Sequence, residues 1–149
     1  RSGEEIQQVC EIIFYGVKVQ LVTTKDGIPI AFHFTPGKTA DAKALGKMID
    51  KLPVEASIYG DSAYLDYGLE DTAFERKCIF LKIQRKSNSK RIDTLEQKME
   101  KLKMRKRVET TISDIKKLFP RTIHAVTLDG FLIKLTLFVF GLQLSKSIN

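Results

Sequence analysis

Two short extended patterns joined by a glycine-containing turn constrain the fold of this chain more than any other feature. Residues 17–21 read VKVQL, and this alternation of apolar and polar residues is typical of a strand with one buried face. The tripeptide Lys25-Asp26-Gly27 supplies turn residues, and residues 28–35 return as a second strand. We therefore expect a β-hairpin over residues 17–35.

The rest of the chain alternates between helical and extended patterns. After Pro36-Gly37, apolar residues recur at helical spacing from Ala42 to Leu52, with Thr39 or Asp41 as a possible cap. The further elements expected are a strand at 55–59, a helix at 69–77, a strand at 78–83, helical sequence over 93–119 and a closing helix at 131–144. With 149 residues and 43% hydrophobic content, the chain can bury a core as one α/β domain, a mixed sheet flanked by helices.

Asp61 follows the strand expected at residues 55–59, in the sequence Gly60-Asp61-Ser62. It therefore stands where a strand ends and a loop begins, which is the usual place for a catalytic side chain on an α/β sheet.

A second candidate lies in the helical stretch 102–119. Arg105, Glu109 and Lys116 are four and seven residues apart, so at about 100° per residue they fall within roughly 40° of one another. A carboxylate between two cations can hold a metal ion while the cations meet a phosphate. The same spacing also fits a surface helix with an i,i+4 ion pair.

The apolar residues of this long helical stretch change direction along its length. Leu95, Met99 and Leu102 point to a different side from the later stripe. That stripe consists of Val108, Ile112, Ile115 and Phe119. We therefore expect a break or kink near residues 103–106, which would separate an exposed basic helix from a core-docked one.

The positive charge is concentrated in the second half of the chain. Residues 82–107 hold 11 Lys and Arg but only 3 Asp and Glu. Such a basic segment is the electrostatic footprint of a protein that binds the phosphate backbone of nucleic acids, although a solvated loop or a patch for anionic membranes would look similar. The candidate DNA-binding residues are Lys82, Arg85, Lys86, Lys90, Arg91, Lys103, Lys106 and Arg107.

Other residue types favour a cytoplasmic protein with no separate metal cluster. Cys10 and Cys78 have no partner pattern, so both are expected to be reduced thiols, Cys78 packed in a strand. His33 and His124 are expected to be structural. The first ten residues are polar, unlike a signal peptide, and the apolar run 131–144 is too short to span a bilayer, so it is expected to be a buried helix.

Three segments resemble the matching parts of bacterial insertion-sequence transposases of the DDE type, from about Tyr15 to the C-terminus. The segments are YGVKVQLVTTKDGIPIAFHFTPGKTADAKAL, YGDSAY and RKRVETTISDIKKLFP. The resemblance implies an RNase H-like fold, with Asp61 as the second catalytic acid. It implies Glu109 as the third, in an R-x3-E-x6-K signature completed by Arg105 and Lys116. The Tyr that often precedes this signature by three residues is Leu102 here.

The first catalytic Asp of that family lies on a strand before the hairpin, and residues 1–14 contain no Asp. Glu11 is a poor substitute, because it leads directly into the hairpin strand and leaves no room for a separate strand and turn. We therefore expect an RNase H-like domain over residues 1–149 that lacks its first strand. Because Arg1 is not a start residue, we also expect that the chain is cut from a longer protein.

The implied activity is transposition, in which Mg²⁺ or Mn²⁺ held by Asp61 and Glu109 supports cleavage of transposon ends and strand transfer to target DNA. The expected partners are double-stranded DNA and a second copy of the chain, without a membrane. Since the first Asp is the ligand shared by both metals in such domains, this chain alone is not expected to cleave. A catalytically dead DNA-binding or dimerisation remnant, or an RNase H-like nuclease or resolvase, are the alternatives.

Overall fold

A mixed five-stranded sheet forms the centre of the molecule. The computed structural model describes residues 5–14, 17–36, 38–118, 125 and 127–148. The strands are β1 (Ile6–Phe14), β2 (Val17–Thr24), β3 (Pro29–Pro36), β4 (Ser57–Gly60) and β5 (Phe80–Ile83), in the order β3-β2-β1-β4-β5. The first three are antiparallel neighbours, whereas β4 and β5 run parallel to β1. The expected hairpin is therefore confirmed as β2 and β3.

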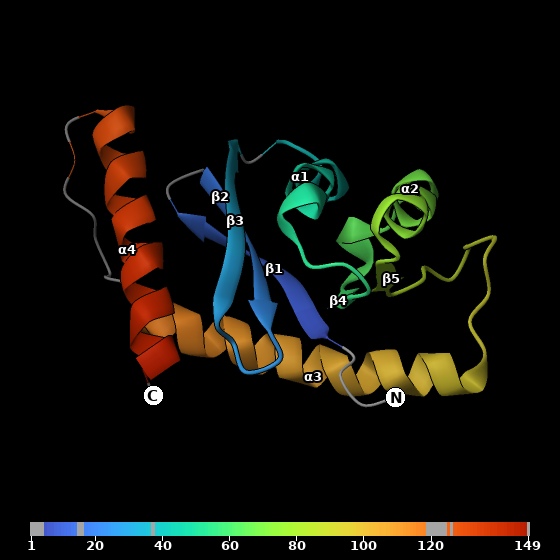
Figure 1. Ribbon diagram of the computed structural model, residues 1–149. Coiled ribbons are helices and arrows are strands. Elements are labelled where there is room, and N and C mark those ends of the chain that lie inside the picture. Colours follow the sequence, from blue (N-terminus) through green and yellow to red (C-terminus); the bar gives the residue numbers. More distant parts are fainter. Residues whose placement is uncertain (1–4, 15–16, 37, 119–124, 126, 149) are drawn as a thin grey trace.

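Helices cover both faces of this sheet (Figure 1). Helix α1 (Asp41–Met48), the short helix η1 (Ile49–Lys51) and α2 (Tyr67–Lys77) lie on one side, while α3 (Leu95–Leu118) runs along the other. Helix α4 (Leu128–Ile148) packs at the β3 end of the sheet. This arrangement confirms the expected α/β class.

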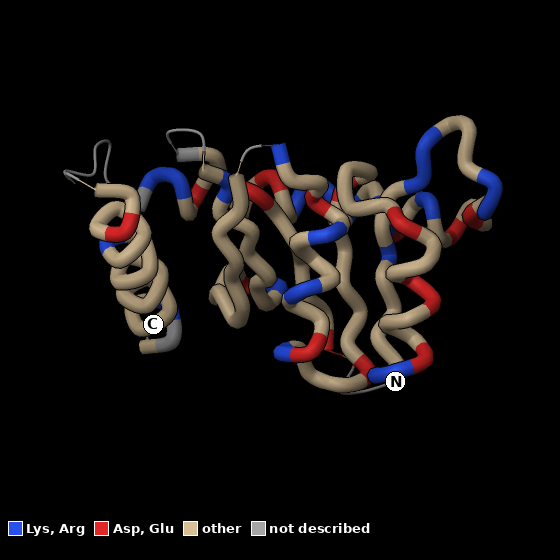
Figure 2. The backbone as a smooth tube through the Cα atoms, turned by 90° about the horizontal axis from the view of Figure 1, so that it is seen from above, with Lys and Arg blue, Asp and Glu red and all other residues tan. Residues whose placement is uncertain are grey.

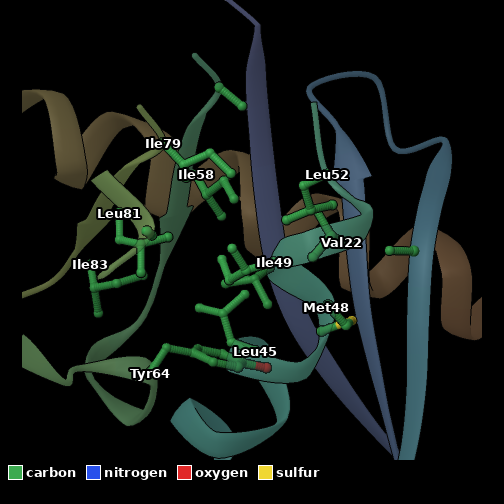
Figure 3. Close-up of a cluster of buried hydrophobic side chains, with 14 residues drawn as sticks. Val22, Leu45, Met48, Ile49, Leu52, Ile58, Tyr64, Ile79, Leu81 and Ile83 are labelled. Carbon is green, nitrogen blue, oxygen red and sulfur yellow. The ribbon is translucent and has the colours of Figure 1, made fainter. Parts of the chain in front are cut away.

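Two apolar clusters, one on each face, hold the layers together. Along β1, Val9 points into the cluster beneath α1 and α2, whereas Cys10 and Ile12 point into the cluster beneath α3 and α4. This alternation follows from the period of two in a strand, since both faces of β1 are covered. Figure 3 shows the first cluster, to which α1 contributes Leu45 and Met48 and β4 contributes Ile58.

The expectation that the first strand is missing was wrong. Residues 6–14 form β1, which occupies the middle of the sheet and pairs with both β2 and β4. A tight connection to β2 is enough, because antiparallel neighbours need only a short turn. The pattern was hidden because Gln7 and Gln8 are polar yet completely buried.

The expected kink in the long helix was also wrong. Helix α3 is continuous over 24 residues. Residues 103–107 (KMRKR) contain no Gly or Pro and are good helix formers, so the change of apolar face does not interrupt the backbone. Instead, Leu95, Met99 and Leu102 remain exposed on the first turns of the same helix.

The closing helix is longer and more exposed than expected. Phe131, Leu135 and Val139 are buried against the sheet, but Leu137 and Leu144 on the opposite side are more than half exposed. Within the described residues, α4 is the one helix whose length and composition would allow it to cross a membrane, and 22% of that stretch is buried. The run predicted to be a buried helix therefore buries only one side.

Smaller differences concern single residues. Cys78 is exposed and precedes β5 rather than packing within a strand, because it closes α2 in a left-handed conformation with φ of 52°. Asp41 belongs to the first turn of α1, and Ala40 is the residue before that turn. The predictions for Phe119 and His124 concern residues outside the described part of the chain.

Candidate functional site

Asp61 lies directly after β4, as its position in the sequence predicted. Its Oδ1 atom accepts a hydrogen bond of 2.9 Å from the backbone N–H of Ala63, so the side chain caps the short helix η2 (Ser62–Tyr64). This bond uses one carboxylate oxygen and fixes the orientation of the group. The residue is exposed to solvent, and its second oxygen remains available to a ligand.

Gly60 determines how closely β4 approaches its neighbours just before Asp61. A Cβ atom at this position would lie 2.6 Å from Cγ1 of Val9 and 3.2 Å from Cδ1 of Ile83. A side chain here would therefore force β1, β4 or β5 to move. The glycine thus sets the position of Asp61 relative to the rest of the sheet.

Glu109 lies in the second half of α3, on the sheet face opposite α1. The Nε atom of Arg105 donates to Oε1 of Glu109 over 3.3 Å, and both side chains are more than half exposed. An exposed i,i+4 pair of this kind contributes only a few tenths of a kcal/mol. The pair therefore leaves Glu109 free to exchange Arg105 for another cation at small cost.

A cavity of about 110 Å³ brings these residues together. Asp61, Arg105 and Glu109 all line it, although Asp61 comes from the end of β4 and the other two from α3. The remaining lining residues are Tyr59, Gly60, Lys82, Gln84, Lys101, Val108 and Ile112. The structure therefore places the two predicted acids and one predicted cation at one site.

Lys116 is the predicted site residue that the cavity does not include. It is exposed on α3, seven residues beyond Glu109. At about 1.5 Å per residue that separation is roughly 10 Å along the helix. Lys116 therefore shares a helix face with Glu109 without sharing its cavity.

Other residues that build the walls were not predicted from the sequence. Tyr59 lies on β4, two residues before Asp61, so the strand period could have revealed it. Lys101 stands one helical turn before Arg105 and is 8% exposed. Its Nζ donates to both oxygens of Asp93, at 3.0 and 2.8 Å, and to the carbonyl of Ile83 at 2.9 Å. Lys101 therefore holds the loop before α3 against β5.

The strand register shows which residue of β1 lies beside Asp61. Gln8 pairs with Tyr59 across the parallel strands β1 and β4. Two residues farther along, this register places Cys10 opposite Asp61, on the face covered by α3. Cys10 is buried, and burial together with the nearby charges of Asp61 and Glu11 raises its pKa to about 12. A neutral thiol therefore occupies this position.

Glu11 points to the other face of the sheet. Its carboxylate lies 3.7 Å from Nζ of Lys18, which forms a closer pair of 3.0 Å with Asp41 of α1. The side-chain amide of Gln20 also donates to Asp41, over 2.8 Å. Burial, and after it the neighbouring Asp41, raises the pKa of Glu11. The carboxylate is thus committed to contacts beneath α1 and does not line the cavity.

These positions define the oxygen ligands that a metal ion would find. Asp61 and Glu109 supply two carboxylates to one cavity, which suits a hard divalent cation. Among the described residues, no group of three or more His, Cys, Asp or Glu side chains is arranged to hold a metal ion. The donor set therefore fits a single weakly held cation, with Cys10 where a third carboxylate would complete the set.

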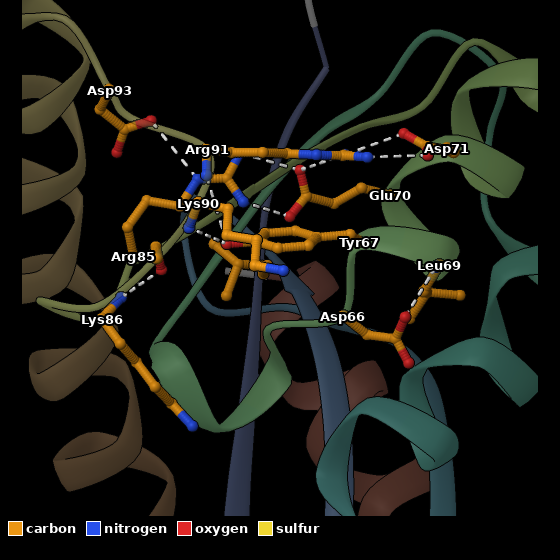
Figure 4. Close-up of polar contacts among 12 residues, drawn as sticks. Asp66, Tyr67, Leu69, Glu70, Asp71, Arg85, Lys86, Lys90, Arg91 and Asp93 are labelled. Carbon is orange, nitrogen blue, oxygen red and sulfur yellow. Dashed lines mark hydrogen bonds and ion pairs between the residues drawn. The ribbon is translucent and has the colours of Figure 1, made fainter.

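The basic segment is anchored to α2 rather than free in solution (Figure 4). Arg85 forms a double ion pair with Glu70, and Arg91 forms one with Asp71 at 2.9 Å for both bonds. The guanidinium of Arg91 lies 4.6 Å from the centre of the Tyr67 ring. The Arg91 contact lowers the pKa of Asp71. These contacts hold the loop after β5 in one shape.

The same contacts divide the predicted DNA-binding residues into two groups. Arg85 forms an ion pair with Glu70, Arg91 forms one with Asp71, and Lys82 pairs with Glu100 over 3.2 Å. The other five form no ion pair with any described residue and are exposed. They are Lys86, Lys90, Lys103, Lys106 and Arg107. Figure 2 shows the basic residues of the loop at the edge of the molecule.

Comparison with known proteins agrees with this arrangement. A family model described as the transposase DDE domain matches residues 13–140. No curated protein matches the chain. The matched range includes the Asp61 strand end, the basic segment and the helix of Glu109, which are the three parts that the structure brings together. The chain therefore belongs to the transposase DDE domain family.

Proposed function

We propose that this chain contains the RNase H-like catalytic domain of a bacterial insertion-sequence transposase, with β1 as its first strand. The activity of that enzyme would be cleavage of transposon ends and their transfer to target DNA. The single observation that carries the proposal is that Asp61 and Glu109, far apart in sequence, line one cavity with Arg105. The family match and the strand order β3-β2-β1-β4-β5 support it.

Asp61 and Glu109 are the residues that would hold a divalent ion, Mg²⁺ or Mn²⁺. Such an ion activates the attacking oxygen and stabilises the leaving oxygen in phosphodiester transfer. If the carboxylate of Glu109 bound an ion, Arg105 would lose its 3.3 Å ion pair with Glu109. Its guanidinium could then bind a phosphate at the cavity rim. Lys101 keeps its contacts with Asp93, so it shapes the wall and contributes positive potential.

The proposed DNA surface consists of the five cations that form no ion pair with a described residue, namely Lys86, Lys90, Lys103, Lys106 and Arg107. The ion pairs of Arg85 and Arg91 hold the loop that carries Lys86 and Lys90. Lys86 and Lys90 are exposed and pair with no carboxylate among the residues that the structure describes. Replacing both with Ala should therefore remove about two phosphate contacts and lower the salt slope of duplex binding by about two. Replacing Arg91 instead breaks its contact with Asp71 and loosens the loop. A fluorescence titration across salt concentrations separates these effects.

Catalysis requires an acid that this chain does not place beside Asp61. With Cys10 at that position, the chain is proposed to bind DNA without cleaving it. It would act as a homodimer on DNA in the bacterial cytoplasm. Because β1 already fills the place beside β4, the acid has to stand on β1, so restoring it as Cys10→Asp should produce metal-dependent nicking at the transposon end. Glu109→Gln should then abolish nicking and leave DNA binding intact, since it removes a metal ligand but no phosphate contact.

Two matched variants complete the experiment. Arg105→Ala and Lys116→Ala should lower the nicking rate less than Glu109→Gln, because they position a strand without holding the ion. If the restored enzyme with Glu109→Gln nicks DNA as fast as its parent, Glu109 is only half of a surface ion pair and the proposed site is wrong.

A further inference from the structure

A row of exposed apolar side chains begins in the loop before α3 and continues along the first turns of the helix. Ile92 is 84% exposed, Leu95 74%, Met99 62% and Leu102 56%. The three helical residues follow at steps of four and three, so they lie on one face. We call these four residues the apolar ridge. Isolated exposed apolar residues are ordinary, but a contiguous row on one face usually marks an interaction site.

The surroundings of the apolar ridge are strongly basic. On α3 the helical period places Lys98 and Arg105 on one side of the ridge, Lys103 on the other and Lys106 in line with it, with Glu96 as the acidic neighbour. Lys98, Lys103 and Lys106 form no ion pair with any residue in the described part of the chain. A second copy of the chain would bring these like charges together, whereas a polyanion would neutralise them.

The ridge is also connected to the candidate active site. Ile92 and Leu102 face a groove of about 550 Å³, whose walls carry Lys86, Ser87, Ser89 and Lys98. This groove and the cavity of Asp61 and Glu109 share three lining residues, Gln84, Lys101 and Arg105. A nucleic acid strand that leaves the cavity along this side therefore meets the apolar ridge next.

For a duplex that runs along α3, the helix sets the distance between this contact and a phosphate held at Glu109. Leu102 and Leu95 precede Glu109 by seven and fourteen residues on the same helix. At 1.5 Å per residue these separations are about 10 and 21 Å. With a spacing of 3.4 Å per base pair, they correspond to roughly three and six base pairs of duplex.

The geometry points to the apolar ridge as a wedge that contacts double-stranded DNA three to six base pairs from the reacting phosphate and bends it there. Proteins that press Leu, Ile or Met between base steps while Lys and Arg hold the flanking phosphates kink the duplex in this way. Flexible steps such as TA bend most easily, so they should be preferred at this position. The inference rests on the proposed function, because it assumes that DNA occupies the cavity.

The test measures DNA binding and DNA bending separately with this chain. A duplex of 30 base pairs carries a donor dye at one end and an acceptor at the other, so that bending brings the dyes together. The variant is Leu95→Ser, Met99→Ser, Leu102→Ser. The matched control is Ile133→Ser, Leu137→Ser, Leu144→Ser on α4, whose side chains are similarly exposed, at 60%, 64% and 65%.

We expect the parent chain and the α4 control to raise energy transfer on binding. The ridge variant should bind within about threefold of the parent affinity, with the same salt slope, and leave energy transfer at the level of free DNA. Both triple variants should keep the circular dichroism of the parent. They should lose similar, small amounts of melting temperature, because each places three serines, which are weaker helix formers than Leu and Met, at exposed helix positions.

Other outcomes would overturn the inference in distinguishable ways. If the parent binds the duplex without raising energy transfer, the ridge does not bend DNA and the proposed function stands. If the parent does not bind duplex DNA at all, the proposed function fails as well. A ridge variant that changes a dimer into a monomer in sedimentation, or that loses binding to anionic vesicles which DNA does not displace, would assign the ridge to a second copy or to a membrane.

Discussion

Two pairs of carboxylates lie on opposite faces of the same sheet and differ in what surrounds them. Glu11 and Asp41 meet beneath α1, where Lys18 and Gln20 donate to Asp41 and burial raises the pKa of Glu11. Asp61 and Glu109 instead line an open cavity beneath α3, and both are exposed. The first pair is enclosed by groups of the protein, although Oε2 of Glu11 has no hydrogen-bond partner in the described part of the chain, whereas the second pair has room for a ligand.

This difference shows that the face of the strand on which a residue lies decides whether it can contribute to the site, even when an acid is its neighbour in the sequence. Glu11 and Cys10 are neighbours in the sequence, but successive side chains of β1 point to opposite faces. The position that faces Asp61 therefore belongs to Cys10. Glu11, one residue away, points to the opposite face beside Asp41 and cannot contribute a ligand to the cavity of Asp61 and Glu109.

The largest expected effect on the unfolding free energy comes from placing an acid at position 10. Cys10→Asp would put a buried charge beside Asp61, so the apo protein should lose roughly 3–5 kcal/mol of unfolding free energy. Millimolar Mn²⁺ should restore much of this loss, because the metal binds only the folded state. Thermal unfolding with and without Mn²⁺ measures both effects. The uncharged control Cys10→Asn keeps Asp61 and Glu109 but adds no third carboxylate, so it should gain less from the metal than Cys10→Asp, and an equal response of the two variants would contradict the assigned register.

A smaller effect is expected in the closed pair and depends on pH. Because the pKa of Glu11 is raised above 4.5, the folded state holds this proton more tightly than the unfolded chain. Its stabilisation is complete below pH 4.5 and is lost as the pH rises through the raised pKa. Glu11→Gln should therefore increase the unfolding free energy at pH 7 by less than about 1 kcal/mol, since solvent screens part of the carboxylate.

Urea unfolding at pH 4 and pH 7 tests this expectation. The gain at pH 7 should vanish at pH 4, where the wild-type carboxyl group is protonated in both states. Asp61→Asn, in the open cavity, is the comparison variant. A gain for Glu11→Gln that is the same at both pH values would show that packing, rather than ionisation, distinguishes the closed pair.

The smallest effect belongs to the exposed ion pair of the open cavity. Arg105→Ala should lower the unfolding free energy by only about 0.3–0.5 kcal/mol, as expected for an i,i+4 pair in water. Salt at 1 M should abolish even this difference. A loss of 2 kcal/mol or more in calorimetry would mean that Arg105 is a structural residue of α3 and is not available to a phosphate.

The sequence was sufficient for most of the fold because the decisive patterns are local. The hairpin was predictable from the alternation of apolar and polar residues and from the turn at Gly27, whose φ of 85° suits glycine. The spacing of Arg105 and Glu109 correctly implied a shared helix face, and their ion pair confirms that proximity. The position of Asp61 at a strand end was equally readable.

Long-range contacts escaped the same reasoning. Gln7 is completely buried within β1, so its polarity concealed a central strand. Arg85 and Arg91 of the basic segment pair with Glu70 and Asp71 of α2, which lie 15 and 20 residues earlier in the sequence. A charge count gives no sign of such pairs, because it cannot tell a cation neutralised by a neighbouring element from a free one.

The continuity of α3 makes it a rigid rod that carries two different surfaces. Its 24 residues extend about 36 Å, with Leu95 exposed on the first turn and Glu109 in the second half. Between them, Lys101 is held by Asp93 and by the carbonyl of Ile83, so the rod is attached to the sheet at β5. Because no break separates the two surfaces, the spacing between the apolar ridge and Glu109 is constant, whatever binds at either one.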